Sequence, residues 1–243
     1  MDEPAGTPPE PTNVEPSQPA PRRRLRRLGW WAAAAAAGAA VTLGLLVRHE
    51  PAFYRGPAAG GGAAAEQLAR RLMTRLSALH ADFVRPGPWE AALACEEINA
   101  WLATDLPRNH PRLLPAGLTG PRVAIGPRRL RAAARVGPLL GGVASVEAEV
   151  VLRGVNQLGI AVTDARLGAL PLPRGPVIRE LARRIDALGM ATELRRLDGR
   201  TLLVVYIPST HDAGATSHWL EALALEDGAV LVAGVTRAAG QQR

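Results

Sequence analysis

One uncharged, apolar stretch limits what this chain can be more than any other part of its sequence. Residues 28–47 read LGWWAAAAAAGAAVTLGLLV and carry no charged side chain. A helix of about 20 residues rises about 30 Å, which matches the hydrocarbon thickness of a bilayer. Such a helix also satisfies its backbone polar groups internally, as lipid requires. The sequence therefore predicts one transmembrane helix at residues 28–47.

The residues on either side of this stretch predict its orientation. Five arginines and two tryptophans mark its N-terminal end: Arg22, Arg23, Arg24, Arg26, Arg27, Trp30 and Trp31. Arginines collect on the cytoplasmic side of a span, and tryptophans prefer the headgroup layer. At the other end, Glu50 lies between Arg48 and Arg55. We therefore expect a single-pass protein of the cell membrane with a cytoplasmic N-terminus. Its C-terminal domain would be extracytoplasmic, and periplasmic in a Gram-negative cell.

A cleaved signal peptide is the alternative to this anchor. Its charged region would be unusually long, at about 27 residues, and its apolar run would exceed the usual 7 to 15. Small residues at 58–65 offer cleavage sites, but they lie well past the apolar run. An uncleaved anchor is the favoured interpretation.

Composition divides the rest of the chain. Residues 1–27 are a Pro-rich tail that ends in the arginine cluster, and within residues 1–21 Val14 is the only large aliphatic side chain after Met1. Such a tail buries too little apolar surface to fold, so we expect it to be disordered, or to serve as a ligand for a polyproline-binding groove. Residues 48–62 are predicted to be a Gly-rich linker, and residues 63–243 an extracytoplasmic domain.

The formal net charge of +7 is carried by arginine alone, because the chain has no lysine. Arginine without lysine, with abundant Ala, Gly and Pro, suggests a bacterial genome of high GC content. Outside the cluster the arginines are scattered, and aromatic residues make up only 4% of the chain. A platform that stacks bases needs aromatic side chains, so we expect no nucleic-acid partner. A basic domain beside anionic lipid headgroups is the simpler interpretation.

Apolar periodicity predicts the fold of the outer domain. Helical spacing indicates amphipathic helices at residues 63–85 and 176–188. Their apolar faces carry Leu68, Leu72, Leu76, Leu79 and Phe83 in the first, and Val177, Ile178, Leu181, Ile185 and Leu188 in the second. Alternation with period two, as at residues 144–152, indicates half-buried strands. The sequence predicts an α+β fold, with an antiparallel sheet packed on two amphipathic helices and preceded by one transmembrane helix.

Turn residues predict the finer order of elements. Residues 89–94 suit a short strand and residues 96–103 a short helix, with a loop from Pro107 to about residue 120. Hairpins are predicted to turn at Gly126-Pro127, at 154–157, at Asp198-Gly199 and at Asp227-Gly228. Asp-Gly between apolar runs is a strong hairpin signal. The polar residues between the last two hairpins suit a loop.

Chemical motifs are scarce. The sequence has no GxxxxGK[ST], no HExxH and no paired CxxC. His211 and His218 lie near Asp212 and Ser209, but a catalytic triad needs proximity in space, so a polar loop is favoured. Cys95, the only cysteine, is better explained as a small buried residue than as a nucleophile or a partner for another chain. We expect no catalytic residue, no cofactor and no metal ligand, and no enzyme activity.

One stretch suggests a family. The segments ACEEINAWLATDLP (94–107), GPRVAIGPRRLRAAARV (120–136), GVASVEAEVVL (142–152) and RLGALPLP (166–173) resemble bacterial membrane proteins with a YpmS-like domain of unknown function. Glu96, Asn99 and Leu102 match its E-x-x-N-x-x-L helix. The resemblance covers about residues 63–190. It implies a membrane-anchored outer domain of unknown role, sometimes compared with tubular lipid-binding folds, and it supplies no catalytic residues.

Two functional hypotheses follow. In the first, the outer domain binds a lipid or another apolar molecule near the membrane, in a groove between a helix and a curved sheet. In the second, the same apolar faces form a filled core, and the domain is a structural or interaction subunit of a cell-envelope complex. The sequence cannot separate them, because residues that line a pocket and residues that fill a core have the same pattern.

Overall fold

The computed structural model describes residues 22–56, 62–137, 141–197, 199–211 and 216–238, and only the backbone of residues 22–34 and 210–211. The chain divides into two units, Met1–Leu43 and Gly44–Arg243. Helix α1 (Arg22–Val47) includes the predicted span. Within the described residues, none of the helices combines the length and the apolar character needed to cross a bilayer. The span at 28–47 stays a prediction, and the side chains of its flanking arginines and tryptophans (Arg22, Arg23, Arg24, Arg26, Arg27, Trp30 and Trp31) lie outside the described residues, as does the predicted tail at 1–21.

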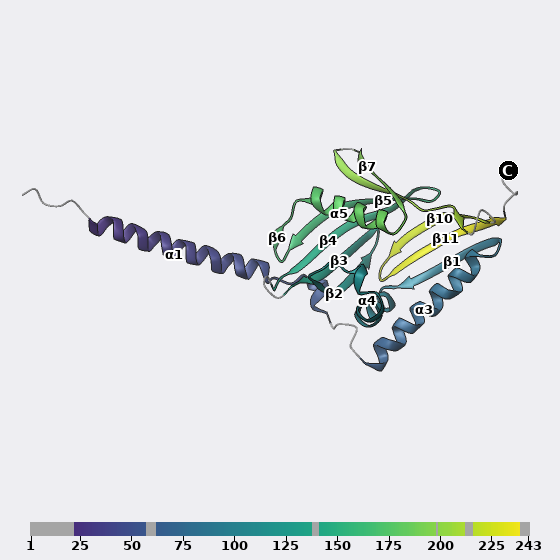
Figure 1. Ribbon diagram of the computed structural model, residues 1–243, viewed down its shortest axis with the longest axis horizontal. Coiled ribbons are helices and arrows are strands. Elements are labelled where there is room, and N and C mark those ends of the chain that lie inside the picture. The colour runs from purple at the N-terminus through teal and green to yellow at the C-terminus, as the bar shows by residue number, and fades with distance from the viewer. Residues whose placement is uncertain (1–21, 57–61, 138–140, 198, 212–215, 239–243) are drawn as a thin grey trace, which may run out of the picture. The chain divides into compact units, whose positions relative to one another are not determined.

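The second unit is an α+β fold built on antiparallel sheets, as predicted (Figure 1). The prediction of one sheet is wrong, because the strands form two. The small sheet has the order β1-β11-β10-β9, with β1 (Gly87–Ala94), β11 (Ala229–Ala238), β10 (Thr216–Glu226) and β9 (Thr210–His211). Hydrophobic alternation shows that a strand has one wet face, but it does not say which strands pair.

The large sheet holds the other strands in the order β2-β3-β4-β5-β8-β7, with β6 paired to β5. Their bounds are β2 (Leu118–Gly126), β3 (Arg129–Val136), β4 (Val143–Gly154), β5 (Gln157–Leu167), β6 (Leu170–Pro171), β7 (Ala191–Leu197) and β8 (Arg200–Tyr206). Helix α5 (Arg174–Ala187) packs on one face through Ile178 and Ala182. Its core partners on the sheet include Val162, Leu203 and Val205. This half of the domain has a filled apolar core.

Helix α3 (Ala63–Phe83) runs beside β1, the edge strand of the small sheet (Figure 1). The Arg75 guanidinium donates to the Ala92 carbonyl of that edge at 3.2 Å. It also pairs with the buried carboxylate of Glu97 at 3.2 Å, on helix α4 (Cys95–Asn109). An edge strand exposes unpaired backbone groups, so a helix and an arginine that cover it protect it from further pairing.

Two hairpin turns of the large sheet meet β10 and so join the sheets. At the β2–β3 turn, the Arg128 N–H donates to the Leu225 carbonyl at 3.2 Å, and the Gly228 N–H donates to Ile125 at 3.0 Å. At the β4–β5 turn, the Asn156 N–H donates to the Leu220 carbonyl at 3.3 Å. The small sheet therefore lies across the hairpin ends of the large one.

Part of the predicted linker lies on the large sheet. Helix α2 (Ala52–Arg55) places the Tyr54 hydroxyl where it donates to the Gly120 carbonyl at 2.8 Å. Glu50 forms an ion pair with Arg135 at 2.6 Å, and the guanidinium of Arg131 lies over the ring of Phe53. Residues 48–56 thus belong to the folded unit, whereas residues 57–61 lie outside the described residues.

Two finer predictions need correction. Helix α4 continues through Pro107 to Asn109, because Leu106 is buried and holds the last turn in place, while a proline so near the end costs few backbone bonds. The loop predicted before Trp219 is shorter than expected. Strand β9 pairs with β10, which already begins at Thr216. The predicted hairpin strands on either side of residues 198–199 and 227–228 are confirmed.

Candidate functional site: an apolar pocket under helix α3

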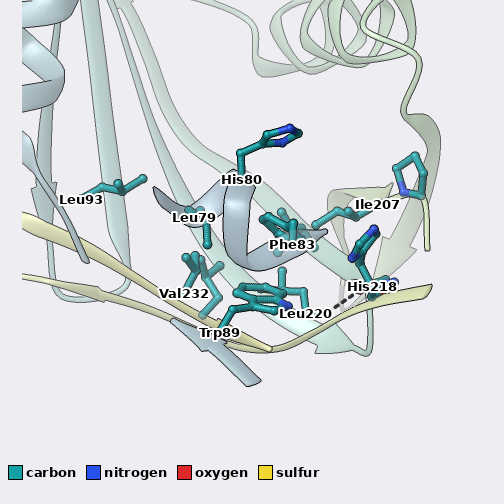
Figure 2. A pocket seen from close by; sticks show the side chains of 13 residues that line it. Leu79, His80, Phe83, Trp89, Leu93, Ile207, His218, Leu220 and Val232 are labelled. Atoms are coloured by element: carbon teal, nitrogen blue, oxygen red, sulfur yellow. Dashed lines mark hydrogen bonds between the residues drawn. The ribbon is translucent and has the colours of Figure 1, made fainter. Parts of the chain in front are cut away.

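A pocket of about 500 Å³ lies between the C-terminal half of α3, the small sheet and the nearby end of the large sheet (Figure 2). Its wall is almost wholly apolar. The apolar side chains that line it are Leu79, Phe83, Trp89, Leu93, Leu158, Ile207, Pro208, Leu220, Leu223 and Val232. They come from α3, β1, β5, β10, β11 and the segment after β8, so the pocket exists only in the folded domain.

Because successive side chains of a strand point to opposite faces, one face of β1 points into this pocket. Trp89 and Leu93 point inward, whereas Pro88, Glu90 and Ala92 are exposed on the other face. Trp89 lies opposite Gly234 of β11, and a Cβ at 234 would collide with its ring and with the Trp219 carbonyl. Glycine at 234 therefore makes room for the indole to form part of the pocket wall.

Helix α3 is packed unevenly along its length. Its first half packs on the domain through Ala65, Ala69 and Leu72, which are buried. Further along, Leu79 and Phe83 are only half-buried and face the pocket. The ring of Phe83 lies 4.5 Å from that of Trp89, centroid to centroid. The helical face predicted from Leu68 to Phe83 is thus partly core and partly pocket wall.

Polar groups gather at one end of the pocket. Thr236 is 1% exposed, and its hydroxyl donates to the Phe83 carbonyl at 3.2 Å. That hydroxyl has one hydrogen, so the His218 Nδ1, 3.0 Å away, must be the donor of their shared hydrogen bond. The edge of the His218 ring also meets Phe83, with centroids 5.2 Å apart.

Asn156 closes the same end from the β4–β5 turn. It is buried, with a φ of 57°, a conformation that asparagine tolerates better than most residues. Its side-chain amide donates to the His218 carbonyl at 2.7 Å and accepts from the Leu220 N–H at 2.6 Å. These bonds hold β10, and with it the pocket wall, against the large sheet.

A second hollow of about 580 Å³ lies between α3 and the small sheet, and it shares Leu79 and Val232 with the apolar pocket. It is lined by the charged side chains Arg75, Asp82 and Glu90, and by small residues such as Ala92 and Ala224. Its charged and small side chains offer less apolar surface than the first pocket does, so we take the apolar pocket as the candidate site.

Carboxylates with displaced pKa values lie away from both hollows. Hydrogen bonds from Arg183 lower the pKa of Glu180 on α5. Hydrogen bonds from Arg195 and Tyr206 lower the pKa of Glu193 on β7, and the bond to Glu193 raises the pKa of Tyr206. These pairs are at the surface and form ordinary ion-pair clusters.

The residues considered for chemistry from the sequence do not meet in one site. His218 lines the pocket, whereas the side chain of His211 and all of Asp212 lie outside the described residues. Cys95 is half-buried at the start of α4, where its thiol accepts from Asn99 at 3.4 Å. The described part of the chain has no cluster of three or more metal-ligating side chains.

Of the E-x-x-N-x-x-L residues, Asn99 has the clearest structural role. Its side chain accepts from the Val123 N–H at 2.8 Å and donates to the Val123 carbonyl at 2.9 Å, which joins α4 to β2. Glu96 is exposed. Comparison of the chain with models of known protein families, with curated proteins and with solved structures found no match. The resemblance to YpmS-like proteins therefore stays a prediction.

Proposed function

We propose that the folded unit binds an apolar molecule, such as a lipid acyl chain, in the pocket under α3, and that the helix at 28–47 anchors it outside the cytoplasm. The observation that carries the proposal is the pocket itself. Its volume of about 500 Å³ and its apolar lining, with a few polar groups at one end, are typical of small-molecule sites.

The contrast between the two halves of the domain favours ligand binding over a purely structural role. On the large sheet, α5 seals a core in which Leu203 is 0% exposed and Ile178 is 3% exposed. On the small sheet, the equivalent helix leaves Leu79 and Phe83 facing open space. A domain that served only as a scaffold would gain stability by filling this space.

The last turns of α1 support the anchoring part of the proposal. Val41, Leu43 and Leu45 are each more than half exposed on this helix. A helix with apolar side chains exposed in several directions is typical of a segment that has another apolar environment. The arginine cluster before it supports a cytoplasmic N-terminus.

Native mass spectrometry of the gently purified full chain tests ligand binding, with two matched Leu→Trp variants. Leu223→Trp places a larger side chain inside the pocket, whereas Leu194→Trp changes an exposed leucine on β7. We expect the parent and Leu194→Trp to retain an apolar molecule that Leu223→Trp binds at least about ten-fold more weakly, a loss of about 1.4 kcal/mol. The retained molecule should raise the melting temperature.

Lipid held around the membrane helix would be retained equally by both variants, so their difference reports on the pocket. Equal retention by Leu223→Trp would show that the molecule binds elsewhere. A parent chain that carries nothing and gains no stability from added fatty acid would leave the interaction-subunit hypothesis in place.

A further inference from the structure

The β5–β6 turn lies directly against the C-terminal end of α1. The Ala169 N–H donates to the Leu46 carbonyl at 2.8 Å, and the neighbouring Gly168 N–H donates to Val143 at 2.8 Å. The last carbonyls of a helix have no partner within the helix. Here a backbone group of the folded domain satisfies one of them, so the turn and the helix end are joined through their main chains.

Two glycines make this contact possible. At Gly168, with a φ of 62°, a Cβ would collide with the carbonyl groups of Leu46 and Val47. At Gly142, a Cβ would approach the Val47 carbonyl to 2.7 Å. A side chain at either position would push the helix end away. The close approach of the two backbones is therefore built into the sequence.

The contact holds the turn beside Leu46, the last residue but one of the predicted span, and the inference rests on the proposed anchor. If residues 28–47 cross the hydrocarbon, the Leu46 carbonyl lies within about 3 Å of its outer boundary, since a helix rises 1.5 Å per residue. The headgroup layer beyond that boundary is roughly 5–7 Å thick on each side. A group bonded to Leu46 must then lie at the base of this layer.

The turn has the composition of a segment that suits this place. Residues 167–173 read LGALPLP, without a charged side chain, and Leu172 remains 37% exposed. The Leu172 N–H is bonded to the Ala165 carbonyl at 2.8 Å, so the segment is held on the sheet. Arg48 directly follows the predicted span, and Arg174 directly follows the uncharged segment 167–173. Arginines are expected at a boundary with anionic headgroups.

We propose that the turn at residues 168–172 is a second membrane contact, which inserts Leu172 into the headgroup layer of the outer leaflet. The domain is then held by a helix and by a turn bonded to its end.

Depth-dependent quenching tests this contact in the full chain, reconstituted into vesicles that contain anionic phospholipid. Cys95→Ser removes the native thiol, and a fluorophore is attached in turn to Leu172→Cys, Leu45→Cys or Val155→Cys. Leu45 lies in the predicted span. Val155, 47% exposed in the β4–β5 turn, is the matched control at the far end of the sheet. The quencher is a phospholipid with a nitroxide on its acyl chain near the headgroup.

We expect lipid-borne quenching at positions 45 and 172 to be at least roughly two-fold stronger than at position 155. Quenching at 45 without quenching at 172 would overturn the second contact while leaving the anchor in place. Quenching at neither position would overturn the anchor and the inference together. Equal quenching at 155 would show that the signal at 172 does not come from a contact confined to the β5–β6 turn, which also contradicts the inference.

Discussion

Asn156 is the residue that ties the two sheets together. Its side chain bonds the His218 carbonyl and the Leu220 N–H of β10, and its own carbonyl accepts from the Ile207 N–H at 2.9 Å. Asn156 forms these bonds while its backbone has a positive φ in a four-residue turn. The sequence marks this position only as part of a predicted turn, because a side chain that bonds a strand more than 60 positions away leaves no local pattern.

Asn156→Ala should destabilise the folded domain by about 2–4 kcal/mol, because it leaves two buried backbone groups without partners. Arg128→Ala is the matched control, since Arg128 has a similar φ of 59° in the β2–β3 turn but an exposed side chain. We expect that change to cost about 0.5 kcal/mol or less. Denaturant unfolding measures both. Similar costs would mean that Asn156 acts only through its backbone conformation.

At the scale of elements, the helices and hairpins could be predicted from the sequence, and their arrangement could not. Helical spacing predicted the ends of α3 and α5 to within two residues. Asp-Gly placed the β10–β11 hairpin, because that dipeptide suits a tight turn. Alternation could not show that β1, from the start of the domain, pairs with β11 from its end. It also could not show the pocket, since Leu72 and Leu79 follow the same spacing, yet only Leu72 is buried.

A pair of substitutions on neighbouring residues of α3 tests this packing. Leu72→Asp should destabilise the domain by about 3–5 kcal/mol, because Leu72 is 4% exposed and the new carboxylate would be buried without a partner. Met73→Asp changes a residue that is 44% exposed and should cost about 1 kcal/mol or less. Thermal unfolding followed by circular dichroism compares them. Equal melting temperatures would show that α3 does not pack through Leu72.

For the whole molecule, the proposed anchor predicts that the two ends of the chain lie on opposite sides of the membrane. A reporter that is active only outside the cytoplasm should be active when fused after Arg243, and a reporter active only in the cytoplasm should be silent there. Replacing the five arginines at 22–27 with glutamine should lower the correctly oriented fraction, because positive charge holds the N-terminus inside. Activity of the cytoplasmic reporter in the parent fusion would contradict the proposed topology. Release of the domain from the membrane fraction would indicate cleavage.

Strand β4 runs from the turn region near Val47 to the turn that closes the pocket, and it has 12 residues. At about 3.3 Å per residue, it separates these two ends by roughly 35 Å. The pocket and the backbone contact at Leu46 therefore lie at opposite ends of the same sheet. A substitution that fills the pocket, such as Leu223→Trp, leaves the residues of the β5–β6 turn unchanged. Ligand binding and membrane contact can therefore be altered one at a time in the same chain.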